Sequence, residues 1–254
     1  MSLTEKDYLK KLDIKILILS RGRYNTITTT KILPDYIEVL VPDNEVELYK
    51  EKINNPILSI PKEIEGLGNV RNWVLHNFEE ETIIMIDDDI KVFYCISNYR
   101  AYATSPEEMV QVLINTAVMA KDMGVHCFGF TQTDIRKYNG CDPFTLCTWV
   151  GCIIGVIGRG DYFREDKYKV DIDFCLKKIL KDRIILCNNM YYAIQNRDNN
   201  VGGNSIYRTQ DDYEKSLNSL CDKWGKYLKK SHSHKSQISL KLNVERKQSI
   251  EYER

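Results

Sequence analysis

The sequence predicts an α/β protein with a mostly parallel, doubly wound sheet. Segments that can form helices alternate with short apolar runs, which lie at residues 15–19, 37–41, 57–60 and 83–86. Such alternation is typical of a parallel sheet that carries helices on its faces. The length of 254 residues allows one large domain with a sizeable core. We therefore expect a single α/β domain.

Three helices are expected between these first four strands. Residues 25–33 can form a brief helix that Pro34 stops, and residues 44–52 form a charged one. The third strand, 57–60, lies between Pro56 and Pro61, which bound it on both sides. The third helix, at residues 69–77, follows a Gly-Leu-Gly segment and leads into the fourth strand.

The second half of the domain has a looser pattern. Residues 106–123 have apolar residues at the spacing of one helical face, and Gly124 is placed to end that helix. Apolar runs predict strands at 126–130 and 148–157, a helix from Asp171 to Leu180, and two short strands at 184–187 and 190–194.

The end of the chain is more polar. A helix is expected at residues 213–230, and the segment that follows Ser231 lacks large apolar residues until Ile238. We expect the domain to cover residues 1–230, and residues 231–254 to form a polar tail that is mobile or docks onto the domain.

Composition limits the environment and the partners. Lys plus Arg and Asp plus Glu number 36 each, so a polyanionic partner has to be bound by a local basic patch. The eight cysteines include no Cys-x-x-Cys pair, and several lie in apolar runs, where reduced thiols pack as small hydrophobes. With neither a signal peptide nor a membrane-spanning run, we expect a cytoplasmic protein without membrane contact.

Three consecutive acids, Asp87, Asp88 and Asp89, directly follow the apolar strand 83–86. Adjacent carboxylates repel one another, and hard oxygen ligands suit Mn²⁺ or Mg²⁺, so a cation that holds a diphosphate is a natural partner. A surface acidic turn is the alternative. The Asp-x-Asp signature of phosphorylated haloacid dehalogenases fits poorly, because the acids follow about the fourth strand and Lys91 stands where that family has a small hydroxyl or β-branched residue.

Two basic segments are candidates for binding phosphate or a nucleotide. Ser20, Arg21 and Arg23 follow the first strand, where parallel sheets bind ligands and where arginine can stack on a base or pair with phosphate. Arg71 lies in the helix that Gly66 and Gly68 open, whose N-terminus favours an anion. Solvated loops and ordinary turn glycines are the alternatives.

Two later segments are further candidates. Asp171 and Asp173 precede a helix, so either can serve as a general base or as a simple N-cap. Gly202 and Gly203, followed by Arg208, can close over a diphosphate or form an ordinary surface loop.

Together these segments resemble metal-dependent glycosyltransferases of the GT-A fold, with a Rossmann-like mixed sheet. The resemblance rests on the first strand, Gly-x-Gly-x-x-Arg, Ile-Asp-Asp-Asp and Asp-x-Asp-Phe-x-Leu, and covers residues 14–208. Within the fold, Ser20-Arg-Gly-Arg23 and Gly68-Asn-Val-Arg-Asn-Trp73 are similar to phage enzymes that are associated with TET and J-base oxygenases. Those enzymes add sugars to hydroxymethylated pyrimidines in DNA, in the host cytoplasm.

The resemblance implies an inverting transfer from a nucleotide-sugar, with a UDP-sugar as the default. Asp89 is implied as the metal ligand together with Asp87, which also contacts ribose or sugar, and Asp88 contacts the donor sugar. Asp171 is implied as the catalytic base, with Asp173 as its substitute. The late metal-binding histidine of many such enzymes has no counterpart between His126 and His232.

The acceptor stays open at this point. Double-stranded DNA with hydroxymethylated bases is the favoured partner, and it needs a positive path and aromatic stacking. The lysines that could provide this path can equally be the solvated face of the terminal helix; they are Lys223, Lys226, Lys229, Lys230 and Lys235. A protein, glycan or small-molecule acceptor, a nucleotidyltransferase activity, and a non-catalytic DNA-binding module are the alternatives.

Overall fold

The computed structural model describes residues 5–134, 136, 142–166, 168–196, 210–232 and 238–244. Contacts along the chain divide it into two compact units, Met1–Arg208 and Thr209–Arg254. This division lies N-terminal to the boundary expected at residue 230.

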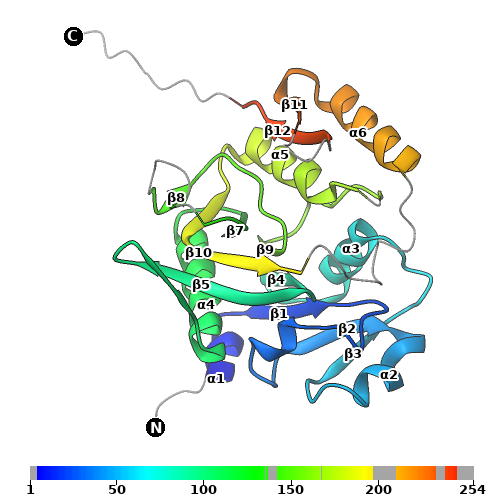
Figure 1. Ribbon diagram of the computed structural model, residues 1–254, viewed down its shortest axis with the longest axis vertical. Helices are drawn as coiled ribbons and strands as arrows, with labels where there is room; N and C mark the ends of the chain where they lie inside the picture. The colour runs from blue at the N-terminus through cyan, green and yellow to red at the C-terminus, as the bar shows by residue number, and fades with distance from the viewer. Residues whose placement is uncertain are drawn as a thin grey trace. The chain divides into compact units, whose positions relative to one another are not determined.

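The first unit is built on one mixed sheet of ten strands within its described residues (Figure 1). Four strands form the parallel part that the sequence predicts, in the spatial order β3-β2-β1-β4. Their bounds are Ile14–Leu19 for β1, Glu38–Pro42 for β2, Ile57–Ile60 for β3 and Thr82–Asp87 for β4. Since these strands are parallel, the residues that follow each of them meet at one edge of the sheet.

The rest of the sheet mixes directions. β9 (Ile153–Ile157) is antiparallel to both β4 and β7 (Cys127–Thr131). β10 (Leu186–Gln195) then pairs parallel with β7 and antiparallel with β5 (Ile90–Ser97). The sheet continues to β6 (Arg100–Ala103), and the short β8 (Phe144–Thr145) also pairs with β10.

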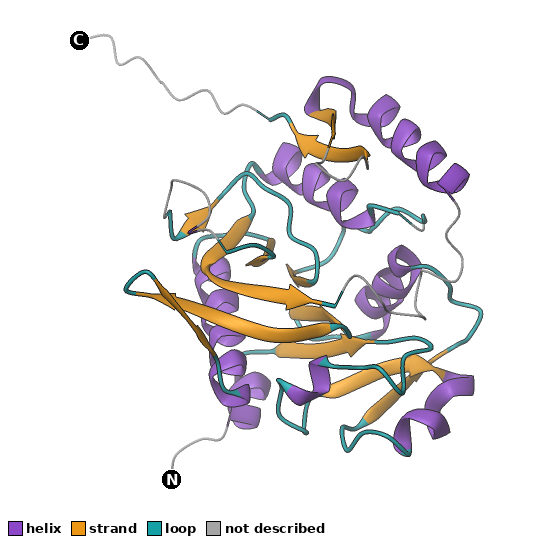
Figure 2. Cartoon of the chain, in the orientation of Figure 1, coloured by secondary structure: helices purple, strands orange, loops and turns teal. Residues whose placement is uncertain are grey.

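Helices cover this sheet. α1 lies against α4, whereas α3 lies against α5 (Figure 2). Their bounds are Glu5–Lys11 for α1, Val46–Lys50 for α2, Leu67–Asn77 for α3, Pro106–Asp122 for α4 and Val170–Asp182 for α5, with short 3₁₀ helices η1 at Thr29–Lys31 and η2 at Asp43–Glu45. α4 starts with a capping box in which the side chains of Ser105 and Glu108 each bind the other's backbone amide.

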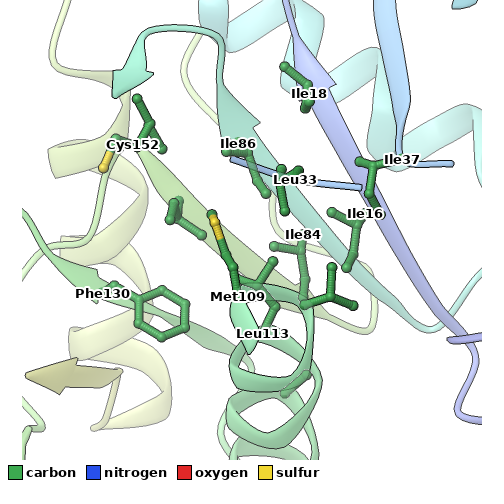
Figure 3. Packing of buried hydrophobic residues seen from close by; sticks show 14 of the residues in the cluster. Ile16, Ile18, Leu33, Ile37, Ile84, Ile86, Met109, Leu113, Phe130 and Cys152 are labelled. Atoms are coloured by element: carbon green, nitrogen blue, oxygen red, sulfur yellow. The ribbon is translucent and has the colours of Figure 1, made fainter. Parts of the chain in front are cut away.

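The main core lies between α4 and one face of the sheet. Met109 and Leu113 of α4 are fully buried beside Ile84 of β4 (Figure 3). Alternate residues of β1, Ile16 and Ile18, point into the same cluster, as the period of two of a strand requires. Truncating a side chain such as Leu113 to alanine costs about 2–5 kcal/mol in cores of this kind, so this layer holds β4 rigidly.

Several predicted elements of the first unit differ from the observed ones. The prediction of a helix at residues 25–33 is wrong, because this segment forms only the short 3₁₀ helix η1. The backbone amides of Thr28 and Thr29 donate to the carbonyl of Asp88 instead of to helical carbonyls. The strand expected at 148–157 starts only at Ile153. The two strands expected at 184–187 and 190–194 are one strand, β10, whose pairing with β7 shifts register after Asn188.

The hairpin of β5 and β6 was not predicted from the sequence. Its turn consists of Asn98 and Tyr99, which both have positive φ angles, 49° and 60°. A turn of two residues with positive φ matches the twist of antiparallel strands. Glycine usually occupies the second position of such a turn. Tyrosine in the second position hid this turn from sequence patterns.

The second unit contains α6 (Gln210–Trp224), the 3₁₀ helix η5 (Gly225–Tyr227) and a hairpin of β11 (Leu228–His232) with β12 (Ile238–Leu242). The helix expected to reach residue 230 therefore ends at Trp224, where Gly225 takes a positive φ of 51°. Part of the expected polar tail is strand β12, whose Leu240 is buried. None of the helices in the described residues is long and apolar enough to cross a membrane.

Candidate functional site

The three acids lie at the edge of the sheet where β1 and β4 end. In the register of these parallel strands, Leu19 is opposite Asp87. Ser20, the next residue of the chain after β1, therefore comes beside Asp88, the next residue after β4. We call Asp87, Asp88 and Asp89 the acidic turn, because they are the last residue of β4 and the two residues that connect β4 to β5.

Asp88 is the most enclosed acid of this turn, with 4% of its surface exposed. Its carboxylate accepts hydrogen bonds from Ser20 Oγ at 2.5 Å and from Arg23 Nη1 at 2.5 Å. The Ser20 hydroxyl also lies 2.6 Å from the hydroxyl of buried Tyr49. Burial raises the pKa of Asp88, although Arg23 and Ser20 oppose that change by stabilising the carboxylate. The donor-sugar role expected of Asp88 stays a prediction.

Asp87 and Asp89 share one partner, Gln195 at the end of β10. Its amide nitrogen lies 3.1 Å from Asp87 Oδ2 and 2.9 Å from Asp89 Oδ1, so it bridges the two carboxylates. Burial raises the pKa of Asp87 to about 7; Arg71 opposes this shift, and the neighbouring Asp89, Asp88 and Asp171 add to it. A pair of carboxylates under this repulsion favours a cation.

The backbone of the acidic turn is fixed at every carbonyl. Thr29 Oγ1 donates to the Asp87 carbonyl at 2.7 Å and accepts from the Ile90 amide at 3.0 Å. The Asp88 carbonyl accepts from the amides of Thr28 and Thr29, and the Asp89 carbonyl accepts from the Asn196 amide at 2.9 Å. These contacts fix the backbone from which the three carboxyl groups project.

Arg71 of α3 is also brought to this edge, but it is buried, with 1% of its surface exposed. Its Nη2 donates to the Gly151 carbonyl at 3.1 Å and lies 3.5 Å from Asp87 Oδ1, and its guanidinium stacks 5.2 Å from the ring centre of Phe163. Its Nε and Nη1 have no hydrogen-bond partner among the described residues. Arg71 thus places positive charge beneath Asp87.

Arg21 and Gly68, which also belong to the two candidate phosphate-binding segments, contact other parts of the chain in the structure. Arg21 donates to the carbonyls of Lys62 and Ile64, at 3.2 and 2.6 Å, and so fixes the loop before α3. A Cβ at Gly68 would lie 2.1 Å from the Arg164 carbonyl oxygen. The close approach that this glycine permits is therefore to the chain itself.

Asp171 lies in the first turn of α5, close to the acidic turn. The residue before α5, Lys169, takes a left-handed conformation with φ of 51°, which is costly for a residue with a side chain. Asp171 is half-buried, and its Oδ2 lies 3.0 Å from the position that a Cβ of Gly151 would occupy. Asp173, the alternative candidate, is fully buried.

The donor set of the acidic turn fits a hard cation. Asp87 and Asp89 supply carboxylate oxygens, and turning the amide of Gln195 would present its oxygen to the same place. Among the residues that the structure describes, no group of three or more His, Cys, Asp and Glu side chains is arranged to hold a metal ion. Two carboxylates would leave most ligand positions of such a cation to other oxygens, for example those of a diphosphate.

Several predicted residues cannot be placed. Gly202, Gly203 and Arg208 lie outside the described residues. Conversely, the sequence analysis did not identify three residues that contact this site, which are Thr29, Tyr49 and Gln195. Thr29 and Tyr49 resemble ordinary core-facing residues in the chain, and Gln195 is 106 residues from Asp89.

Comparison with known proteins shows which family this chain resembles. Residues 14–204 match the model of a family described as TET-Associated Glycosyltransferase. This match covers the parallel strands, the acidic turn, α5 and β10. No curated protein sequence matches the chain.

Two solved structures that resemble this chain were determined with UDP or a UDP-sugar bound. Glucosyl-3-phosphoglycerate synthase from Mycobacterium tuberculosis, in complex with Mn²⁺, UDP and phosphoglyceric acid, has a TM-score of 0.51 at 13% identity, over 95% of this chain and 91% of that one. S. aureus TarS 1-349 in complex with UDP-GlcNAc has a TM-score of 0.47 at 15% identity, over 79% of this chain and 63% of that one. The chain thus spans less than two thirds of that TarS structure. The GT-A fold predicted from the sequence is confirmed.

Proposed function

Since the chain belongs to the TET-Associated Glycosyltransferase family, we propose that it transfers a sugar from a UDP-sugar to a hydroxyl group. The observation that carries this proposal is the meeting of the acidic turn, Arg23 and Asp171 at one edge of the sheet. That set can bind a metal diphosphate on one side and activate an acceptor on the other.

Asp87 and Asp89 are the proposed ligands of Mn²⁺ or Mg²⁺. Their carboxylates already share one hydrogen-bond donor, and a cation would offset their repulsion more strongly than an amide does. When bound, the metal would offset the charge of the diphosphate as the nucleotide leaves. The glucosyl-3-phosphoglycerate synthase with the same fold was solved with Mn²⁺ and UDP, which supports this choice.

The donor is proposed to bind between the end of β1 and the acidic turn. Arg23 lies there with 15% of its side chain exposed, against 1% for Arg71. Arg23 can therefore contact a phosphate directly, whereas the buried Arg71 stabilises the carboxylate of Asp87. Ser20, Arg21 and Asp88 frame this region, and Gly202, Gly203 and Arg208 are proposed to cover the diphosphate.

Asp171 is proposed as the general base. It is half-buried and close enough to influence Asp87 electrostatically, whereas Asp173 is fully enclosed. The acceptor oxygen forms a bond to the anomeric carbon as the bond from that carbon to the diphosphate oxygen breaks. The acceptor proton goes to Asp171, and the electron pair leaves with UDP. This in-line displacement inverts the configuration of the sugar.

The acceptor we propose is a 5-hydroxymethylpyrimidine in DNA. The support is the family description, because TET-type oxygenases supply hydroxyl groups of this kind on DNA bases, and the sequence segments that resemble the phage enzymes. A protein, glycan or small-molecule acceptor and a non-catalytic DNA-binding role are the outcomes that the experiment below can give instead.

The test measures donor hydrolysis and transfer in the same samples. Purified protein is incubated with UDP-, GDP- and TDP-sugars, with Mn²⁺ or with a chelator, and then with DNA that contains 5-hydroxymethylcytosine. We expect UDP release that requires Mn²⁺, and a DNA product whose mass increases by one sugar. Asp89→Ala should remove both reactions, and Asp171→Asn should remove transfer while UDP still binds.

A matched control is Asp122→Asn, which changes an exposed acid at the end of α4 and should leave both reactions unchanged. Transfer to DNA at the normal rate by Asp171→Asn would overturn the base assignment. Failure of every nucleotide-sugar to bind or react would overturn the transferase, and DNA binding without turnover would then identify a non-catalytic module.

A further inference from the structure

We propose that Trp149 and Gln132 form an acceptor subsite next to Asp171 and that this subsite takes a planar heterocyclic ring. The inference rests on the proposed function of the same site, and it names the residues that select the acceptor. The term acceptor subsite is used below for Gln132, Trp149, Gly151 and Asp171.

The evidence is the convergence of three side chains on one backbone position. From the point where a Cβ of residue 151 would lie, Gln132 Nε2 is 2.6 Å away, Asp171 Oδ2 is 3.0 Å away and the Trp149 ring carbon Cζ3 is 3.0 Å away. These three side chains come from three different segments of the chain, and each of them is half-buried. An amide, a carboxylate and an indole ring thus converge on the same backbone position.

The topology explains why they meet beside the acidic turn. Gln132 directly follows β7, and Gly151 precedes β9, which pairs with both β7 and β4. The Asp87 amide donates to the Cys152 carbonyl at 2.8 Å, and Arg71 donates to the Gly151 carbonyl. The acceptor subsite is therefore tied by hydrogen bonds to the residues that are proposed to bind the donor.

Gly151 keeps this place free of a side chain. Even a methyl group there would come within 3.0 Å of the other three members of the subsite, a distance that forces at least one of them to move. Any larger residue would push Asp171 or Trp149 aside. Gly151 therefore allows the carboxylate of Asp171 and the indole ring of Trp149 to lie close together.

The chemistry of these side chains favours a flat ring over a sugar or a peptide. An indole face binds a nucleobase by stacking, and this interaction tolerates different bases. A glutamine amide has a donor and an acceptor that can meet the polar edge of a base. With a pyrimidine placed so, a hydroxymethyl substituent on the ring can point to Asp171.

A base in a duplex cannot reach such a subsite without leaving the stack. The subsite therefore implies that the target nucleotide is flipped out of the duplex or is single-stranded when it reacts. Mismatched or single-stranded targets should then react faster than fully paired ones, since less pairing and stacking is lost.

The first experiment separates acceptor binding from donor binding. Trp149→Ala should raise the KM for hydroxymethylated DNA about tenfold, and Trp149→Phe less, because phenylalanine keeps a smaller stacking face. The KM for the UDP-sugar should stay near the wild-type value in both variants. Gln132→Ala should raise the acceptor KM and weaken the preference between hydroxymethylcytosine and hydroxymethyluracil. Trp73→Phe, which changes a residue of α3, is the matched control.

The second experiment needs no turnover. In the presence of UDP and Mn²⁺, 5-hydroxymethyl-2′-deoxycytidine should quench tryptophan fluorescence in the wild-type protein and in Trp73→Phe, but not in Trp149→Phe. Glycerol, a hydroxyl compound without a ring, should not quench it. Circular dichroism of each variant shows whether the fold is kept.

The outcomes distinguish this inference from the proposed function. Normal transfer to DNA with an unchanged acceptor KM in Trp149→Ala would overturn the subsite and leave the transferase standing. No transfer to DNA, together with quenching that depends on Trp149, would overturn the DNA acceptor and support the ring-binding subsite. Absence of quenching in the wild type, or equal quenching in Trp149→Phe, would overturn the subsite.

Discussion

Thr29 is a single residue on which the shape of the acidic turn depends. It is completely buried, and its hydroxyl bridges the Asp87 carbonyl and the Ile90 amide. Both groups belong to the segment that carries the acids, so the hydroxyl fixes the direction in which this segment leaves β4. Thr29, which is remote in sequence from the proposed metal ligands, thus positions the backbone that carries them.

We predict that Thr29→Val lowers the free energy of unfolding by about 1–3 kcal/mol, because it leaves a buried amide and a buried carbonyl unpaired. It should also weaken Mn²⁺ binding. Thr29→Ser keeps the hydroxyl and loses one methyl group, which costs about 1 kcal/mol. Urea denaturation and calorimetric titration with Mn²⁺ measure the two effects. Equal losses in both variants would mean that the methyl group, and not the hydroxyl, matters.

The part of the candidate site that follows the parallel strands could be predicted from the sequence. Ser20, Arg23 and the acidic turn do lie together, because the ends of neighbouring parallel strands meet at one edge. Gln195 could not be predicted, since its contact with Asp87 spans 108 residues of the chain. The packing role of Arg21 was also hidden, because a sequence does not show which carbonyls a loop exposes.

The turn between β5 and β6 is an element in which local sequence and observed backbone disagree. Tyr99 has a positive φ of 60° and a side chain that is 79% exposed. The side chain therefore gains little from packing, while the backbone bears the cost of a conformation that favours glycine.

We predict that Tyr99→Gly raises the free energy of unfolding by about 1 kcal/mol, because asparagine followed by glycine is a favoured pair in this turn. The hydrogen bond from Arg136 Nη1 to the residue 99 carbonyl, at 3.0 Å, does not need the side chain. Urea denaturation measures the change. The control is Ser97→Gly in β5, which should lower stability. A loss of stability in Tyr99→Gly would show that the exposed ring has a partner.

The elements themselves were predictable where the hydrophobic pattern was regular. The first four strands, α3 and α4 follow their expected positions closely. The helix expected at residues 25–33 failed because the amides of Thr28 and Thr29 are used by Asp88, and tertiary contacts outweigh local propensity. β10 was split in the prediction because polar Asn188 and Asn189 interrupt its apolar run.

At the scale of the whole molecule, the protonation of Asp87 links stability to pH. Its pKa is about 7 in the fold, against the ordinary 3.8 that applies after unfolding. Around it lie Arg71, Asp88, Asp89 and Asp171. The folded protein keeps this proton up to about neutral pH, whereas the unfolded chain loses it near pH 4. Stability from this group is therefore full below pH 4 and is lost as pH rises toward 7.

We predict that the unfolding free energy of the metal-free protein falls between about pH 4 and about pH 7, and that Asp87→Asn reduces this slope. Mn²⁺ should counteract the fall, because it binds the folded carboxylates and competes with the proton. Chemical denaturation over this pH range, with a chelator or with Mn²⁺, tests both statements. Asp122→Asn serves as the control. The same slope in Asp87→Asn and the wild type would contradict the assignment.

The place of β10 in the sheet also has a consequence for how the chain is made. β5 and β6 are synthesised well before β10. In the part of the chain that the structure describes, these two strands join the rest of the sheet only through β10, which lies between β7 and β5. During translation, one edge of β5 and one edge of β7 therefore have no partner strand until β10, which ends at residue 195, has left the ribosome. Such edges can pair with other chains, so slow synthesis or a premature stop before β10 would favour aggregation. The contacts of Gln195 with Asp87 and Asp89 would also form only when β10 joins the sheet.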